Sequence, residues 1–216
     1  MESIKNVGAE LEPPRRRPGG RTAEITQRIR EAVLALLLEG GVENCTITHV
    51  ADRSGVERST LYRRYPDRWS AVIDAVIDKF QRDAPIQLTG SFAGDLKSLL
   101  SNLASAMATP LGPAIVAAAG ALHQEGQVAA ARTFFERRMD QLTPIFDAAF
   151  EQGELPAGTD CEELFVFASG SLWFGKFIAS RPVDEAAIDR IVTAVCTLYC
   201  TPAGKRSIGR FRGVHR

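Results

Sequence analysis

Histidine is scarce in this sequence, and its scarcity argues against an enzyme. The three histidines are His49, His123 and His215. Their spacing suggests no set of a nucleophile, a base and an orienting acid. The chain also lacks a glycine-rich loop of the kind that binds phosphate groups. We therefore expect no catalytic residues and no cofactor.

Long hydrophobic runs are missing as well, which argues against a membrane protein. The longest apolar stretches, 114–122 and 164–174, are much shorter than the roughly 20 residues that cross a bilayer. The N-terminus carries Glu2, Lys5 and Glu10 with no apolar run behind them, unlike a secretory signal. These features predict a cytoplasmic protein with no membrane partner.

Cysteine is sparse, and its spacing does not suggest a metal site. The four cysteines are Cys45, Cys161, Cys196 and Cys200. The last two are four residues apart and would share one face of a helix, but no histidine or second cysteine pair accompanies them as a zinc site requires. Large intracellular chains normally keep such thiols reduced. We expect free thiols and no metal.

The chain has no net charge, but its charges are unevenly distributed. Residues 15–68 hold eleven Lys or Arg against seven Asp or Glu, and residues 205–216 hold five basic residues and no acid. Between residues 83 and 204 the count is seven basic against fourteen acidic. A basic front and an acidic body suit a chain whose front contacts phosphates.

The apolar residues recur at helical spacing, with no alternating strand pattern and no repeat of fixed period. A flexible basic arm is predicted over residues 1–21. The first helix is expected to begin near Thr22 and to end at Gly40 and Gly41. Its apolar stripe consists of Ile25, Ile29, Val33, Leu36 and Leu37.

Two short helices are predicted next, joined by a tight turn. Thr46 can cap the first of them, and Gly55 offers the positive φ that a sharp turn needs. The second spans roughly 57–64 and ends before Pro66, because the residue preceding a proline is pushed away from the α region. A further helix is expected to open near Asp67.

Pro85 and the stretch 88–90 mark the predicted boundary to a second, larger domain. Its expected helices cover 95–108, 114–124, 128–151 with an interruption or kink at Pro144, 162–179 and 184–200. The sequence thus predicts an all-α fold. A three-helix helix-turn-helix domain at 22–82 precedes a helical domain at 83–204 and a basic tail at 205–216.

Two short helices joined by a glycine turn and braced by a third form the geometry that places a recognition helix in the major groove of DNA. Arginine can grip guanine with two hydrogen bonds, and hydroxyls can serve bases or phosphates. The predicted contacts to double-stranded DNA are Thr46, Thr48, Arg58, Ser59, Thr60, Tyr62, Arg63, Arg64 and Arg68. Among them, Tyr62 and Arg68 are expected to hold phosphates. The arginines at 15–17 either solubilise the arm or touch DNA.

The segment 46–56, TITHVADRSGV, followed by STLYRRYPDR at 59–68, resembles the DNA-binding signature of the TetR family of regulators. The likeness extends from Thr22 to Phe80. Glu57 departs most from the signature, because serine is usual at this position and an acid there lies close to DNA.

The resemblance implies that the second half is a helical ligand-binding and dimerisation domain, which pairs through its last two long helices and encloses a small-molecule effector. The candidate pocket residues are Met107, His123, Phe135, Phe146, Trp173 and Phe177. Most aromatic side chains at helical spacing pack in a core instead of lining a cavity, and His123 is either a ligand contact or a satisfied polar group.

The function implied by the resemblance is that of a ligand-responsive repressor that binds a palindromic operator as a homodimer. The alternative is a DNA-binding adaptor whose helical domain binds a protein partner instead of a small molecule.

Overall fold

The structure, a computed structural model, describes residues 18–206. Within this range the regular structure is helical throughout and contains no β-strand, which confirms the predicted all-α class. The part of the predicted arm up to residue 17, including the arginines at 15–17, lies outside the described residues, as does the predicted basic tail from residue 207 onward.

The N-terminal bundle consists of α1 (Pro18–Gly40), the 3₁₀ helix η1 (Val42–Asn44), α2 (Ile47–Ser54), α3 (Arg58–Arg64) and α4 (Arg68–Asp83). α1 begins at Pro18, not at the predicted Thr22, so the segment expected to end the arm starts the helix instead. Proline is tolerated in the first turn because its missing N–H would have no helical partner there. α1 packs against α2 and α4. The α1 side chains Ile29, Val33 and Leu37 are fully buried between these helices.

The second half consists of α5 (Phe92–Met107), α6 (Leu111–Gln124), α7 (Val128–Glu151), α8 (Cys161–Phe177) and α9 (Glu185–Tyr199). α5 starts earlier than the predicted residue 95, because Ser91 Oγ caps it by accepting a hydrogen bond from the Gly94 N–H at 3.2 Å. α6 also starts earlier than predicted, with Pro113 in its first turn. α7 runs past Pro144 without ending there.

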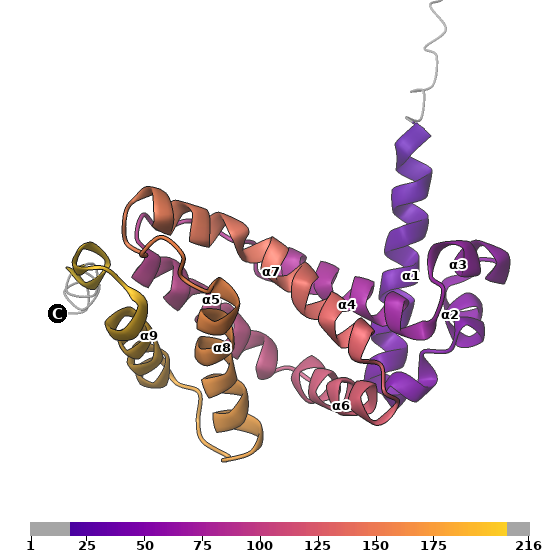
Figure 1. Cartoon of the computed structure of the whole chain (residues 1–216). Coiled ribbons are helices and arrows are strands. Elements are labelled where there is room, and N and C mark those ends of the chain that lie inside the picture. The colour runs from indigo at the N-terminus through magenta and orange to yellow at the C-terminus, as the bar shows by residue number, and fades with distance from the viewer. Residues whose placement is uncertain (1–17, 207–216) are drawn as a thin grey trace, which may run out of the picture.

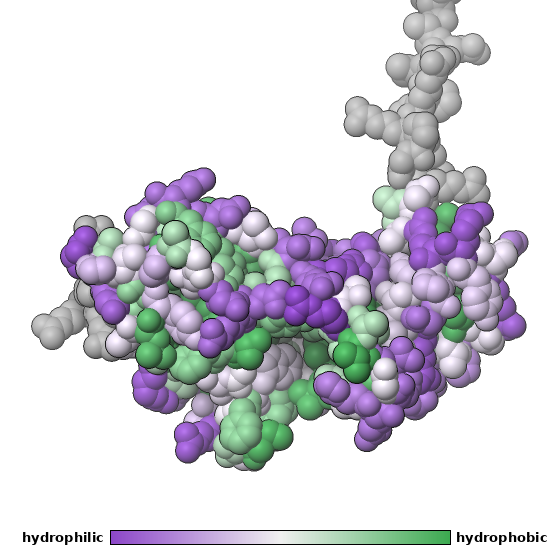
Figure 2. All heavy atoms as spheres, in the orientation of Figure 1, coloured by the Kyte–Doolittle hydropathy of each residue, from purple (hydrophilic) through white to green (hydrophobic). Residues whose placement is uncertain are grey.

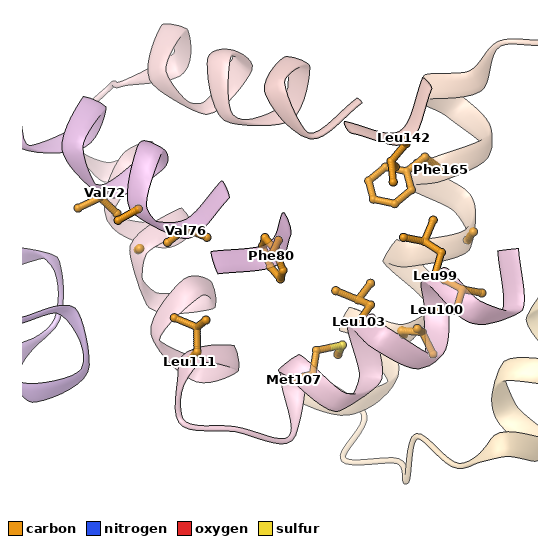
Figure 3. Close-up of a cluster of buried hydrophobic side chains, with 14 of the residues drawn as sticks. Val72, Val76, Phe80, Leu99, Leu100, Leu103, Met107, Leu111, Leu142 and Phe165 are labelled. Atoms are coloured by element: carbon orange, nitrogen blue, oxygen red, sulfur yellow. The ribbon is translucent and has the colours of Figure 1, made fainter. Parts of the chain in front are cut away.

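Figure 1 shows an elongated molecule with α1, α2 and α3 gathered at one end and α8 and α9 at the other. α4 and α7 run lengthwise between these ends and pack against each other. Buried side chains of α4, α5, α7 and α8 form one continuous core (Figure 3), which includes Val76, Phe80, Leu103, Met107, Leu142 and Phe165. The helix-turn-helix is therefore mechanically connected to the helical body through α4.

No single helix among residues 18–206 is long and apolar enough to cross a membrane. α5 and α6 reach that length and composition only when taken together across an 88° bend.

Candidate DNA interface

The turn between α2 and α3 has the backbone conformation that the sequence predicts. Gly55 adopts φ 63° and ψ 30°, the left-handed region, and its N–H bonds the Ala51 carbonyl to end α2. Val56, just after it, is buried, as are Val50 of α2 and Leu61 of α3. These side chains fix the angle between the two helices, so α3 is held rigidly against the bundle.

Arg28 of α1 braces this turn from behind. Its Nη2 donates hydrogen bonds to the carbonyl oxygens of Ser54 and Gly55, the latter at 3.2 Å. A Cβ added at Gly55 would lie 2.9 Å from Arg28 Nη2. Position 55 therefore favours glycine because of its positive φ, and a larger residue would also displace the end of the Arg28 side chain.

We expect Gly55→Ala to lower the free energy of unfolding by about 1–2 kcal/mol, because an L-residue is strained in the left-handed region. Arg28 would also have to move. Urea unfolding followed by circular dichroism measures this loss. The matched control is Gly120→Ala in α6, where an added Cβ meets nothing within 4 Å and the change should be neutral or stabilising. Equal effects of the two substitutions would contradict the role given to Gly55.

α3 presents a continuous polar face to the outside. Arg58, Ser59, Tyr62 and Arg63 are exposed and lie three or four residues apart, so they share one side of the helix. The Tyr62 side chain is 59% exposed. Thr60 is half-buried at the edge of this face. The structure thus brings together four of the predicted DNA contacts on one accessible surface.

Three of the other predicted contacts, Thr46, Arg64 and Arg68, bond groups of the protein itself. The Arg64 guanidinium donates to Thr26 Oγ1 of α1. Thr46 Oγ1 accepts the His49 N–H at 3.2 Å and caps α2, and Thr48 is half-buried. Arg64 is itself half-buried, so its side chain braces α3 in this structure.

Arg68 at the start of α4 connects the two halves of the chain. Its Nη1 bonds Glu43 Oε2 at 3.1 Å, and its Nη2 bonds Glu125 in the turn between α6 and α7. The neighbouring Trp69 Nε1 donates to the other Glu125 oxygen at 2.9 Å. Glu125, which the sequence analysis did not single out, therefore ties the helix-turn-helix side of α4 to the helical body.

Glu57, the residue that departs from the family signature, is the N-cap of α3. Its side chain is exposed and accepts no capping hydrogen bond. α3 therefore begins without the side-chain cap that serine would supply.

A second connection between the halves is centred on Asp74 of α4. Its carboxylate accepts hydrogen bonds from Arg30 Nε of α1 at 2.8 Å, Arg137 Nη2 of α7 at 2.9 Å and the Tyr65 hydroxyl at 2.9 Å. Burial raises the pKa of Asp74, but the hydrogen bonds from these donors lower it by more. The pKa of Asp74 therefore lies below the ordinary value of 3.8. Asp74 remains ionised at neutral pH and holds α1, α7 and Tyr65, the residue that follows α3, to α4.

The predicted pocket residues do not gather at one of the larger hollows. Met107 and Phe146 are buried in the core, the latter with its ring 6.4 Å from that of Phe92. Phe135 packs on the Phe165 ring, Trp173 stacks on Phe177, and His123 is exposed. None of the six lines the 350 Å³ hollow between α8 and α9, the 370 Å³ hollow where α1, α4, α5 and α6 meet, or the 50 Å³ apolar cavity between α4 and α6. Phe135 and Phe165 form a contact between α7 and α8, whereas Trp173 and Phe177 stack along α8 itself. The grouping of the six residues around one ligand stays a prediction.

Comparison with known proteins gives matches over most of the chain. The family model described as Tetracyclin repressor-like, C-terminal domain, matches residues 86–195. The HTH-type transcriptional regulator AqdR of Rhodococcus erythropolis is 30% identical over 153 residues, which cover 70% of this chain and 73% of AqdR.

Solved structures show the same architecture. The TetR family transcription regulator SCO0332 aligns with a TM-score of 0.69 and 26% identity, covering 82% of this chain and all of that one (100%). The flavonoid-responsive regulator FrrA aligns with a TM-score of 0.57 and 19% identity, covering 83% of this chain and 98% of that one. Both comparisons include a helix-turn-helix followed by a helical domain.

Proposed function

The chain belongs to the TetR family of transcription regulators, and on this premise we propose that it is a homodimeric repressor that releases a palindromic operator when a small molecule binds its helical domain. That it is a DNA-binding regulator and not an enzyme follows from the family. The repressor role, the dimer and the effector are the parts proposed here, as is action in the cytoplasm, where the DNA is accessible.

The exposed face of α3 is the observation that carries the proposal. Arg58 and Arg63 are exposed, and within residues 18–206 their only ion pair is a 3.9 Å approach of Arg58 to Asp52. An arginine that is exposed on a rigid recognition helix can bond guanine O6 and N7. We assign base contacts to these two arginines and phosphate contacts to Tyr62.

The remaining predicted contacts are also proposed to touch DNA, but two of them would first have to leave their partners in the protein. Arg64 would have to leave Thr26 to reach a base, and Arg68 would have to leave Glu43 or Glu125 to reach a phosphate. Thr46, Thr48, Ser59 and Thr60 offer hydroxyls near the start of either short helix.

The dimer is proposed to form through α8 and α9. Five large apolar side chains on these helices or at the end of α8 are exposed, namely Val166, Phe167, Phe174, Ile178 and Leu198. Figure 2 shows hydrophobic atoms gathered at the lower end of the molecule, where α8 ends in Figure 1. A two-fold interface would cover such a patch and place two recognition helices on one duplex.

The experiment that tests this function is selection of bound fragments from a random duplex pool by the full chain. A homodimeric operator-binding protein should enrich an inverted repeat with half-sites about 34–36 Å apart or a multiple of that distance. Enrichment of no sequence, or of a single unrepeated motif, would contradict the proposal. A protein-binding adaptor would also enrich the repeat, but no small molecule would make it release the DNA.

Arg63→Ala is expected to weaken binding to the selected duplex by about 1–3 kcal/mol, which is about 5- to 150-fold, and to relax the preference at one base pair of each half-site. Fluorescence anisotropy on duplexes that vary one position at a time measures both effects. Arg132→Ala in α7 is the control, because Arg132 pairs with Glu162 far from α3. Unchanged base preference in the Arg63 variant would remove Arg63 from the contacts.

A further inference from the structure

Arg138 of α7 is a buried cation that has no acidic partner among residues 18–206. Its side chain lies in the core with only 9% of its surface exposed. Arg30 and Arg137, which lie in the same part of the molecule, both form ion pairs with Asp74. In the described part of the chain no carboxylate pairs with Arg138.

The contacts of Arg138 position it but do not neutralise it. Its Nη1 donates to Gln141 Oε1 at 2.9 Å, and the guanidinium lies over the Phe80 ring at 5.1 Å from the centroid. Gln141 Nε2 in turn donates to the Ile77 carbonyl of α4 at 3.2 Å. Gln141 is therefore fixed by α4 and holds the guanidinium at the contact between α4 and α7.

The charge persists despite its burial. Burial lowers the pKa of Arg138 to about 10, still well above neutral pH, so the guanidinium stays protonated. An ionised group in an apolar core is unfavourable unless an opposite charge accompanies it. The ring of Phe80 and the partial negative charge at the C-terminal end of α4 offset part of this penalty. A buried cation that lacks a counter-ion is poised to bind an anion.

The surroundings define what kind of anion fits. Phe80 contacts the guanidinium, Leu142 follows Arg138 one turn later on α7, and both belong to the apolar core in Figure 3, so the part of a ligand next to Arg138 must be apolar. Phe80 also lines the 370 Å³ hollow, which is within the size range of small-molecule sites. Polar side chains such as Lys79, Asp83 and Asn102 line the same hollow, and α7 contributes no residue to it. Phe80 is therefore the residue that contacts both the Arg138 guanidinium and the hollow. A single cation matches the single charge of a carboxylate better than the charge of about −1.5 to −2 of a phosphate group.

We propose that the effector of this regulator is an apolar carboxylate and that Arg138 binds its carboxylate group, with Gln141 as a positioning residue. The inference rests on the proposed ligand response and names the chemical class of the ligand. A planar guanidinium and a carboxylate form two parallel hydrogen bonds. The bound anion would supply the counter-ion that the protein lacks.

The site lies where a ligand can influence the helix-turn-helix. Phe80 is near the C-terminal end of α4, whose N-terminal end carries Arg68 and Trp69 against Glu125. A carboxylate bound to Arg138 would compete with its contacts to Phe80 and Gln141 and so change the contact of α7 with α4. The ligand would then act by binding one orientation of α4 more tightly than the other.

The first test needs no ligand. Arg138→Met keeps the approximate length of the side chain and removes the charge, so the melting temperature of the ligand-free protein should stay the same or rise by up to about 4 °C. Arg137→Met is the matched control and should lower it by about 2–4 °C, because it takes a donor from Asp74. A fall of the melting temperature in Arg138→Met as large as in Arg137→Met would show that Arg138 is structural and would overturn the proposal.

The second test uses a panel of straight-chain carboxylates from hexanoate to dodecanoate together with 2-naphthoate, each paired with its amide. In calorimetry, at least one carboxylate should bind the wild-type chain, and its amide should bind at least 10-fold more weakly. The affinity of Arg138→Met for the same carboxylate should fall by a similar factor. Equal binding of acid and amide, binding unchanged by Arg138→Met, or no binding of any member would overturn the proposal.

Affinity for the selected duplex is measured separately with and without the carboxylate. A carboxylate that binds through Arg138 without weakening the DNA complex would contradict the proposed ligand-responsive function and leave the Arg138 site in place. A ligand that releases the DNA but binds wild type and Arg138→Met equally would support the ligand-responsive function and contradict the Arg138 site.

Discussion

Replacing Asp74 by asparagine is expected to lower the free energy of unfolding by about 2–3 kcal/mol. The carboxylate accepts bonds from Arg30, Arg137 and Tyr65, and Asp74 itself is only 13% exposed. The amide keeps the shape but cannot balance two guanidinium groups. The loss is smaller than that of a fully buried pair because Arg30 and Arg137 are 24% and 38% exposed. At fixed protein concentration the melting temperature should fall by about 4–12 °C.

The control for this change is Asp83→Asn in the same helix. Asp83 is 53% exposed and its ion pair is with Lys79 one turn away, so its loss should stay within about 0.5 kcal/mol.

The dependence of stability on pH gives a further check of the role of Asp74. Because the pKa of Asp74 is lower in the folded state, its contribution is present above about pH 4 and is lost as the pH falls through the lower folded pKa. The difference between wild type and Asp74→Asn should therefore shrink below pH 4. A difference that is constant down to pH 2 would contradict the ion-pair account.

Phe174→Glu is expected to raise the dissociation constant of the homodimer by about 100-fold or more. Phe174 is 63% exposed on α8, next to exposed Ile178. Burial of a Phe side chain contributes about 1.5–3 kcal/mol, and two-fold symmetry counts the substitution twice. The added carboxylates would also face each other or an apolar surface. Sedimentation equilibrium measures the constant, and operator affinity should fall with it.

Val128→Glu is the matched control for the dimer. Val128 is 66% exposed, about as much as Phe174, but it lies at the start of α7 and is not one of the exposed apolar side chains of α8 and α9. It should leave the dissociation constant of the dimer unchanged. If both variants remained dimeric at micromolar concentration, the interface would have to be sought outside α8 and α9.

The local structure of the DNA-binding half could be predicted because its determinants act over a few residues. Thr46 caps α2, Gly55 supplies the positive φ, and Asp67 forms a capping box with Ser70, each within a single turn. Such preferences depend on nearby backbone groups only. The predicted start of α1 at Thr22 was wrong, because a single sequence does not distinguish a proline at the first helical position from a proline in a loop.

The partners of the predicted DNA contacts could not be predicted, because they come from distant segments. Arg64 bonds Thr26, 38 residues away, and Arg68 bonds Glu125, 57 residues away. Exposure on a helical wheel does not show which arginine another helix will engage. Two of the predicted contacts therefore brace the protein in this structure.

Arg138 was missed although its position carries a signal. Phe134, Arg138, Leu142 and Phe146 follow one another at intervals of four, so Arg138 occupies the apolar stripe of α7. A charge on such a stripe is either turned to solvent or buried. The sequence could not choose between these outcomes, because the side chains that cover Arg138, such as Phe80, belong to another helix.

Native mass spectrometry of the full chain on its selected duplex tests the central claim most directly. The account predicts two chains on a duplex that holds both half-sites. It also predicts that a duplex of the same length with one half-site scrambled binds at least 100-fold more weakly, because one recognition helix then loses its base contacts. One chain per duplex, with equal affinity for the full and the scrambled site, would contradict the claim that this protein reads a two-fold operator as a dimer.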